Sequence, residues 1–212
     1  MRNSAGRVRR RLSYEAARIM VEEGTRDYKR AKQKACLRIG VPTNQSVPSN
    51  LEVEDSVAEH LQIFFSDAAV DLKWQYLRIA FEMMQKLKRY SPRLVGATLS
   101  GNITSARPIE LQVFADTVEE IRFLLEDAEI PCRMMQKRLR YSRVGFCHIT
   151  GFEVDFEETF MEILVFLPAD PYPPLGAVNG KPQARFAMKK VKRLLESRQG
   201  DSIAKGGASA AQ

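Results

Sequence analysis

The residues with the clearest capacity for chemistry are a glycine-bearing turn and the polar side chains on the strand that follows it. The stretch Arg93–Gly101 contains Gly96, and a second apolar stretch, Pro108–Asp116, follows a short polar insert. In the second stretch Glu110 and Gln112 alternate with apolar residues, so the two polar side chains face the same side of a predicted strand. The apolar residues that face the core are Ile109, Leu111 and Val113. A carboxylate beside a glycine turn is suited to phosphate or metal chemistry.

A second carboxylate, Glu162, lies in an apolar run. The run Phe160–Phe166 is apolar on both faces, which predicts a central strand. An unpaired charge in such a strand costs several kcal/mol. The carboxylate therefore needs a metal, an arginine partner or a proton to compensate its charge.

The turn and the two carboxylates together resemble the nucleotidyltransferase superfamily. Members of that family carry a hydrophobic-Gly-Ser turn, an acidic-x-acidic strand and a third acidic residue on a later strand. Gly96 falls on the family glycine and Glu110 on the first carboxylate, while Met161-Glu162-Ile163 matches the third best and Val154-Asp155-Phe156 is a second candidate. More broadly, residues 14–185 resemble a bacterial group of nucleotidyltransferase-like proteins with an added helical N-terminus.

Two positions depart from the family pattern, because Ala97 replaces the phosphate-binding serine and Gln112 replaces the second carboxylate. The resemblance implies Glu110 and Glu162 as catalytic residues and ligands of Mg²⁺, with a nucleoside triphosphate as substrate or ligand. Nucleotidyl transfer needs clustered carboxylates because two Mg²⁺ ions must be held about 4 Å apart. The residues expected to contact the nucleotide are Gly96, Ala97, Ser100, Gly101 and Gln112. Active transfer, a fold retained for binding nucleotide or RNA, and a structural role all stay open.

The elements around these residues predict an α/β (α+β) fold with a helical N-terminal segment. The resemblance implies that its sheet is a nucleotidyltransferase-like mixed sheet flanked by helices. Residues 117–120 have the spacing of a capping box at the start of a helix. Further strands are expected over Cys132–Tyr141, Phe146–Asp155 and Thr159–Leu167. The last two could form a hairpin. The proline-rich residues 168–182 are expected to form a surface loop, which could also act as a lid.

Helices are expected on both sides of this region. A capping box at Ser49–Glu52 begins one helix, and a break at Ser66–Asp67 precedes a second that ends at Tyr90. A last helix is expected over Gln183–Ser197. The expected organisation is a basic helical segment and linker (1–48), an α/β domain with its leading helices (49–199) and a disordered tail (200–212).

Positive charge gathers at both ends of the chain. Residues 1–38 hold 12 Lys and Arg against 4 Asp and Glu, and residues 181–212 hold 8 against 2. A helix that begins after Thr25 would carry a cation every fourth residue, which could follow a phosphate backbone or be a solvated face. The candidate nucleic-acid contacts are Arg26, Arg30, Lys34, Arg38, Lys189, Lys192 and Arg193. RNA or another nucleic acid is the expected partner, and an acidic protein is the alternative.

Composition narrows the class of protein. The chain has 212 residues with 44% hydrophobic content, which suits a globular fold, and no apolar run reaches the roughly 18 residues of a membrane span. The basic start leads into no apolar signal segment, although it could mimic an organelle transit peptide. Three widely spaced cysteines fit neither a disulfide framework nor a zinc site, so a reducing, cytoplasmic setting is expected. The two histidines have no recognisable Ser or Cys partner. The sequence does not indicate an oligomeric state.

Overall fold

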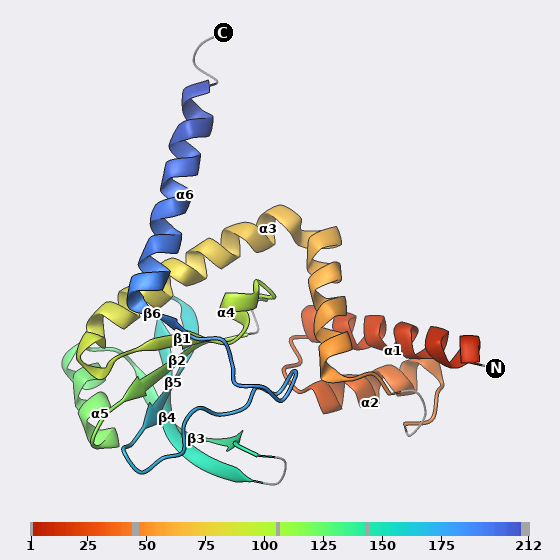
Figure 1. Cartoon of the computed structure of the whole chain (residues 1–212), viewed down its shortest axis with the longest axis horizontal. Helices are drawn as coiled ribbons and strands as arrows, with labels where there is room; N and C mark the ends of the chain where they lie inside the picture. Colours follow the sequence, from red (N-terminus) through yellow and green to blue (C-terminus); the bar gives the residue numbers. More distant parts are fainter. Residues whose placement is uncertain (1, 44–46, 105–106, 143–144, 209–212) are drawn as a thin grey trace.

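The chain forms a helical N-terminal unit joined to a mixed sheet with helices on one face (Figure 1). The computed structural model describes residues 2–43, 47–104, 107–142 and 145–208. The helices are α1 (Arg2–Glu22), α2 (Tyr28–Ile39), α3 (Asn50–Lys86), α4 (Ala97–Ser100), α5 (Val118–Asp127) and α6 (Met188–Ala208), with a 3₁₀ turn at Lys88–Tyr90. The strands are β1 (Arg93–Val95), β2 (Ile109–Phe114), β3 (Cys132–Arg140), β4 (Phe146–Phe156), β5 (Thr159–Phe166) and β6 (Phe186–Ala187).

The six strands lie in the order β3-β4-β5-β2-β1-β6. Strands β2 and β5 are parallel, and the other neighbouring pairs are antiparallel. This confirms the expected mixed sheet flanked by helices. It also places β5 in the interior of the sheet, as its two apolar faces predicted.

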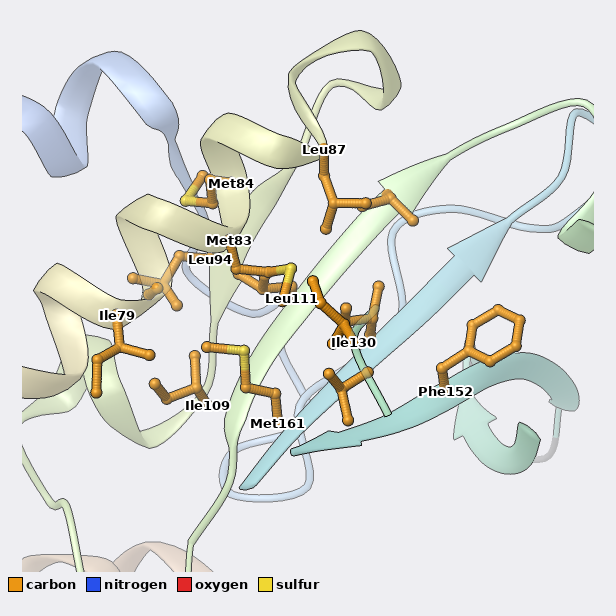
Figure 2. Packing of buried hydrophobic residues seen from close by; sticks show 14 of the residues in the cluster. Ile79, Met83, Met84, Leu87, Leu94, Ile109, Leu111, Ile130, Phe152 and Met161 are labelled. Carbon is orange, nitrogen blue, oxygen red and sulfur yellow. The ribbon is translucent and has the colours of Figure 1, made fainter. Parts of the chain in front are cut away.

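One face of the sheet forms the main core. The second half of α3 lays Ile79 and Met83 against Leu111 and Met161 of the two central strands (Figure 2). Helices α5 and α6 add buried residues to the same core. The alternation of apolar and polar residues along β2 therefore separates this core face from the face that carries Glu110.

A second core holds the N-terminal unit together. Helices α1 and α2 pack against the first turns of α3, where Val53, Val57 and Leu61 are buried. From Tyr76 onward, the buried residues of α3 belong to the main core. The two cores therefore divide within α3.

Two helices differ from their expected lengths. The expected break at Ser66–Asp67 is absent from the backbone, because α3 runs without interruption and instead changes direction between its orange and yellow parts (Figure 1). The capping box at Ser49 and Glu52 begins this helix as expected. Helix α6 begins at Met188, five residues later than expected, because Phe186 and Ala187 pair with β1 as an edge strand.

The C-terminal helix extends beyond the expected end. Helix α6 continues to Ala208, so residues 200–208 are helical where a disordered tail was expected. The rest of that expected tail, residues 209–212, lies outside the described residues. Within the described ranges, no helix combines the length and apolar character needed to cross a bilayer.

The hairpin of β3 and β4 curls where it leaves the sheet. Strand β4 pairs with β5 only from Gly151 onward, whereas its earlier residues pair with β3 alone. At Gly151 the strands approach so closely that a Cβ atom would lie 2.4 Å from the carbonyl oxygen of Ile163 and 3.0 Å from the Cα of Leu164. Only glycine fits this position without moving the backbone of β5.

We expect Gly151→Ala to lower the free energy of unfolding by about 1 to 3 kcal/mol, because the added methyl group meets backbone atoms that cannot rotate away. Gly6→Ala is the matched control: Gly6 is an exposed residue of α1 with open space around its Cα. That change should raise stability by about 0.5 to 1 kcal/mol through helix propensity. Chemical denaturation of both variants measures the difference, and an unchanged Gly151→Ala protein would contradict the close approach.

Candidate functional site

Two carboxylates lie side by side at the centre of the sheet. Glu110 on β2 and Glu162 on β5 are register partners across the parallel pair. Because their neighbours in sequence face the core, both side chains project from the opposite face. Parallel register therefore brings together two carboxylates that are 52 positions apart in the sequence.

The ammonium group of Lys137 lies between these carboxylates. Its Nζ atom donates to Oε2 of Glu110 at 3.1 Å and to Oε2 of Glu162 at 2.5 Å. Burial lowers the pKa of Lys137, but the charges and hydrogen bonds of the two glutamates outweigh burial and hold this pKa above its ordinary value. The lysine is therefore a protonated cation shared by two acids.

A second cation reaches the same group from the N-terminal unit. Arg26, in the connection between α1 and α2, places Nη1 3.6 Å from Oε1 of Glu162. Its guanidinium also lies over the ring of Phe160, 4.9 Å from the ring centroid. Two cationic groups thus face the two carboxylates, and one of them links the helical unit to the sheet.

Gly96 lies directly against Glu110. Its φ of 77° and ψ of −154° are a conformation open to glycine and strained for other residues. A Cβ atom at this position would lie 2.4 Å from Oε1 of Glu110. The structure therefore brings together Gly96, Glu110 and Glu162, the three residues on which the family resemblance depends.

The other residues expected to contact nucleotide divide into two groups. Ala97 and Ser100 line the cleft described below, although the Ser100 hydroxyl donates to the Ala97 carbonyl at 3.1 Å. Gly101 faces the side chain of Lys73 and does not line this cleft. Gln112 is buried and accepts a hydrogen bond from the Tyr172 hydroxyl at 3.2 Å. The expected nucleotide contacts from Gly101 and Gln112 are therefore not supported by their positions.

The carboxylate pair lies in a cleft of about 1300 Å³ between the sheet and the N-terminal unit. Apolar and aromatic side chains form part of its wall, among them Leu139, Phe146 and Phe186. Cations outnumber carboxylates among the described residues that line it. These cations are Arg26, Lys29, Lys32, Arg107, Lys137, Arg138 and Arg140, and the carboxylates are Asp27, Glu54, Asp55, Glu110 and Glu162.

A buried ion pair fixes the position of the N-terminal unit over the cleft. Both oxygens of Glu54 on α3 accept from Arg107, each at 3.0 Å, in a bidentate pair. Asn102, just after the glycine turn, donates to the same carboxylate at 2.9 Å, and the Tyr28 hydroxyl of α2 donates as well. Three segments, α2, α3 and the connection between α4 and β2, are joined at this one carboxylate.

The loop at residues 168–182 closes one side of the cleft. The side-chain amide of Asn50 donates to the carbonyl oxygen of Ala177 at 2.8 Å, and Lys32 donates to Asn50 Oδ1 at 2.8 Å. Leu175 forms a β-bridge with Arg140 at the end of β3. The expected surface loop therefore covers the sheet edge at this point, and it contacts the helical unit across the cleft.

The expected line of cations on α2 is not a continuous basic surface. Arg26 precedes the helix, whose N-cap is Asp27 and not Thr25. Lys34 pairs with Glu23, which directly follows α1, and Arg38 pairs with both Glu23 and Glu15 of α1. Because these pairs hold α2 against α1 and the residue that follows it, the cations at every fourth position serve the packing of the helical unit. Arg30 is exposed.

The cations of α6 lie apart from the cleft. Lys189, Lys192 and Arg193 are exposed on the first half of α6, and Lys192 is 3.6 Å from Glu196. None of the three lines the cleft. Figure 1 shows α6 projecting away from the N-terminal unit. The two groups of expected nucleic-acid contacts therefore do not form one surface.

The carboxylate pair does not fit the expected magnesium site. Over the described ranges, no cluster of three or more His, Cys, Asp or Glu residues is arranged to hold a metal ion. The two glutamates instead direct one oxygen each to the ammonium group of Lys137, which lies between them where a metal ion would be bound. Magnesium bound to the same two oxygens, at about 2.1 Å, would overlap the ammonium group.

The chain was compared with models of known protein families, with curated proteins and with solved structures, and none matches.

Sequence reasoning missed the most important residue of this site. Lys137 lies in the strand expected over Cys132–Tyr141, where no role was predicted for it, yet its same-face neighbours Met135 and Leu139 pack in a small apolar cluster. A lysine between two apolar residues at period two signals a buried charge that needs partners. The pair of Glu54 and Arg107 had no comparable signal, because the two residues are 53 positions apart.

Acidification should weaken the buried pair of Glu54. Burial raises the pKa of Glu54, but bonds and charge from Arg107, with those from Tyr28 and Asn102, outweigh burial and hold it below its ordinary value near 4.5. Stabilisation by this carboxylate is therefore present above the ordinary value and is lost as pH falls through the folded-state value. We expect Glu54→Gln to lower stability by about 3 kcal/mol at neutral pH, because it leaves Arg107 without a charge partner.

The difference between wild type and Glu54→Gln should shrink once pH falls below the folded-state pKa of Glu54. Denaturation across a pH series measures it. The neighbouring exposed carboxylate provides the control, since Asp55→Asn should change stability by less than about 0.5 kcal/mol. A difference for Glu54→Gln that stays constant into acid would contradict the assigned ion pair.

Proposed function

We propose that this chain is a nucleotidyltransferase-like protein that binds a free nucleotide by its phosphates in the cleft and does not transfer it. The observation that carries the proposal is the meeting of Gly96, Glu110 and Glu162 in this cleft. This is the arrangement that the family resemblance implies for nucleotide chemistry. A cleft with convergent polar groups and apolar walls is also the ordinary form of a small-molecule site.

Loss of transfer follows from the shared ammonium. Transfer in this family requires the carboxylates to hold metal ions that bridge the triphosphate and activate the attacking hydroxyl. Here the two carboxylates form ion pairs with Lys137, and Ala97 replaces the serine. Gln112, in place of the second carboxylate, is buried and accepts a hydrogen bond from Tyr172. Nucleotide binding without transfer does not require metal-holding carboxylates, a serine at position 97 or a carboxylate at position 112.

Phosphate would be bound by cations at the cleft wall. Arg26 and Lys29 are exposed, line the cleft and belong to the segment that faces the carboxylate pair. Charge-assisted hydrogen bonds to phosphate oxygens are about twice as strong as neutral ones. The nearby aromatic side chains Phe146 and Phe186 offer an apolar surface for a base.

A free nucleotide is favoured over RNA by the distribution of charge. An RNA strand would need a continuous row of cations spaced along its phosphates. Lys34 and Arg38 are paired within the helical unit, and the exposed cations of α6 lie outside the cleft. By contrast, seven cations among the described residues line the single cleft that holds the carboxylate pair, which suits a compact polyphosphate.

The direct test is calorimetric titration with each of the four nucleoside triphosphates. We expect at least one to bind, and Arg26→Gln and Lys29→Gln each to weaken it by about tenfold, since each removes one charge-assisted contact. Lys189→Gln is the matched control, because it removes an exposed lysine outside the cleft. Its affinity should equal that of wild type.

Two results would contradict the proposal. The first is the absence of binding by all four triphosphates. The second is tighter binding of a single-stranded RNA oligonucleotide that weakens with Lys189→Gln but not with Arg26→Gln, which would assign the function to α6 and to nucleic acid.

A further inference from the structure

We propose that the ammonium group of Lys137 replaces the divalent cation of this cleft, so that the site is closed to metal and binds its nucleotide without Mg²⁺. Binding of nucleotide without Mg²⁺ rests on the proposed function. The closure to metal concerns only this chain's own residues and stands or falls independently.

Position is the first argument. Nζ of Lys137 lies 3.1 Å from Oε2 of Glu110 and 2.5 Å from Oε2 of Glu162. A divalent ion held by the same two oxygens must sit between them, because Mg²⁺ binds carboxylate oxygens at about 2.1 Å and Mn²⁺ prefers similar ligands. The ammonium and the metal would overlap, so only one can be present.

Charge is the second argument. Two carboxylates face the ammonium of Lys137 and the guanidinium of Arg26, which is 3.6 Å from Glu162. The four charges balance, and a metal ion added to this group would create a net positive charge in a largely buried place. A metal could enter only by expelling the lysine, and that would leave an unpaired ammonium in the cleft wall.

The third argument is that the fold fixes the lysine. Lys137 is carried by the curled part of the β3–β4 hairpin, and Met135 and Leu139 on the same face pack in an apolar cluster with Ile149 and Phe166. This packing holds the backbone of Lys137 where its ammonium reaches both glutamates.

An ammonium also provides what a bound phosphate needs. It has three N–H donors, and the two glutamates accept two of them. The third remains for a phosphate oxygen of the ligand. A single protein-borne charge thus takes one of the roles of the metal, orientation of a phosphate, without activating a nucleophile.

The test is to remove the ammonium and ask whether metal enters. In calorimetry and in thermal unfolding, wild type should not bind Mn²⁺ at concentrations up to about 1 mM. Lys137→Met should bind Mn²⁺ with a Kd roughly tenfold or more below that limit, and the ion should stabilise this variant against unfolding. Two adjacent carboxylates without a cation repel each other and attract a metal.

Two controls separate the pair from ordinary surface carboxylates. Lys137→Met combined with Glu162→Gln leaves one carboxylate and should lose the gained Mn²⁺ binding. Arg133→Met removes an exposed cation that pairs with the single carboxylate of Glu153 on the same hairpin, and it should gain none. Equal Mn²⁺ binding by wild type and Lys137→Met, or no binding by a folded Lys137→Met protein, would overturn the inference.

Other measurements decide the matter if Lys137→Met fails to fold. Lys137→Gln keeps a hydrogen-bonding side chain without the charge and should show the same gain in Mn²⁺ binding. In the wild-type protein, Mn²⁺ binding that disappears in Glu162→Gln would overturn the inference outright. Nucleotide affinity that is equal in EDTA and in Mg²⁺ supports metal independence, whereas absence of nucleotide binding together with a closed metal site rejects only the proposed function.

Discussion

The site depends on one shared cation. Glu110 and Glu162 are side by side because β2 and β5 are parallel and in register, and two carboxylates so placed repel each other unless a positive charge lies between them. Lys137 provides that charge from a strand at the far edge of the sheet order. The apolar neighbours of Lys137 hold its strand in place, and the missing side chain at Gly96 leaves room for Glu110.

A second ion pair holds the N-terminal unit in place on the opposite side of the cleft from Lys137 and its two glutamates. Glu54 accepts hydrogen bonds from both terminal nitrogens of Arg107 and from the side chain of Asn102. These bonds join the first part of α3 to the segment after the glycine turn. Arg26 adds a contact from the α1–α2 connection to Glu162. The N-terminal unit has its own apolar core, so these polar contacts, and not a continuous hydrophobic core, set the shape of the cleft. Such an arrangement leaves polar groups in place for a charged ligand.

The parts of this fold that sequence could predict are those governed by local rules. Alternation placed Glu110 on the face away from the core, the apolar run around Glu162 indicated an interior strand, and capping boxes marked the starts of α3 and α5. The missed features depend on distant partners. Lys137 becomes a site residue only because its side chain reaches from edge strand β3 to glutamates on β2 and β5, and Phe186 becomes a strand residue only because β1 offers an open edge. Likewise, the sequence pattern of the α2 cations indicates a nucleic-acid surface, but Glu15 of α1 and Glu23, which follows α1, pair with Lys34 and Arg38.

Nuclear magnetic resonance of the Lys137 side chain tests the central claim most directly. A ¹⁵N-detected experiment on the ammonium group reports both its protonation and, through scalar couplings across hydrogen bonds, its acceptors. The account predicts couplings from Nζ to the carboxyl carbons of both Glu110 and Glu162, and a protonated state that persists above the ordinary lysine pKa because the two glutamates hold that pKa high against the effect of burial. A Lys137 signal that exchanges freely with water, shows coupling to neither glutamate and titrates at or below the ordinary value would contradict it.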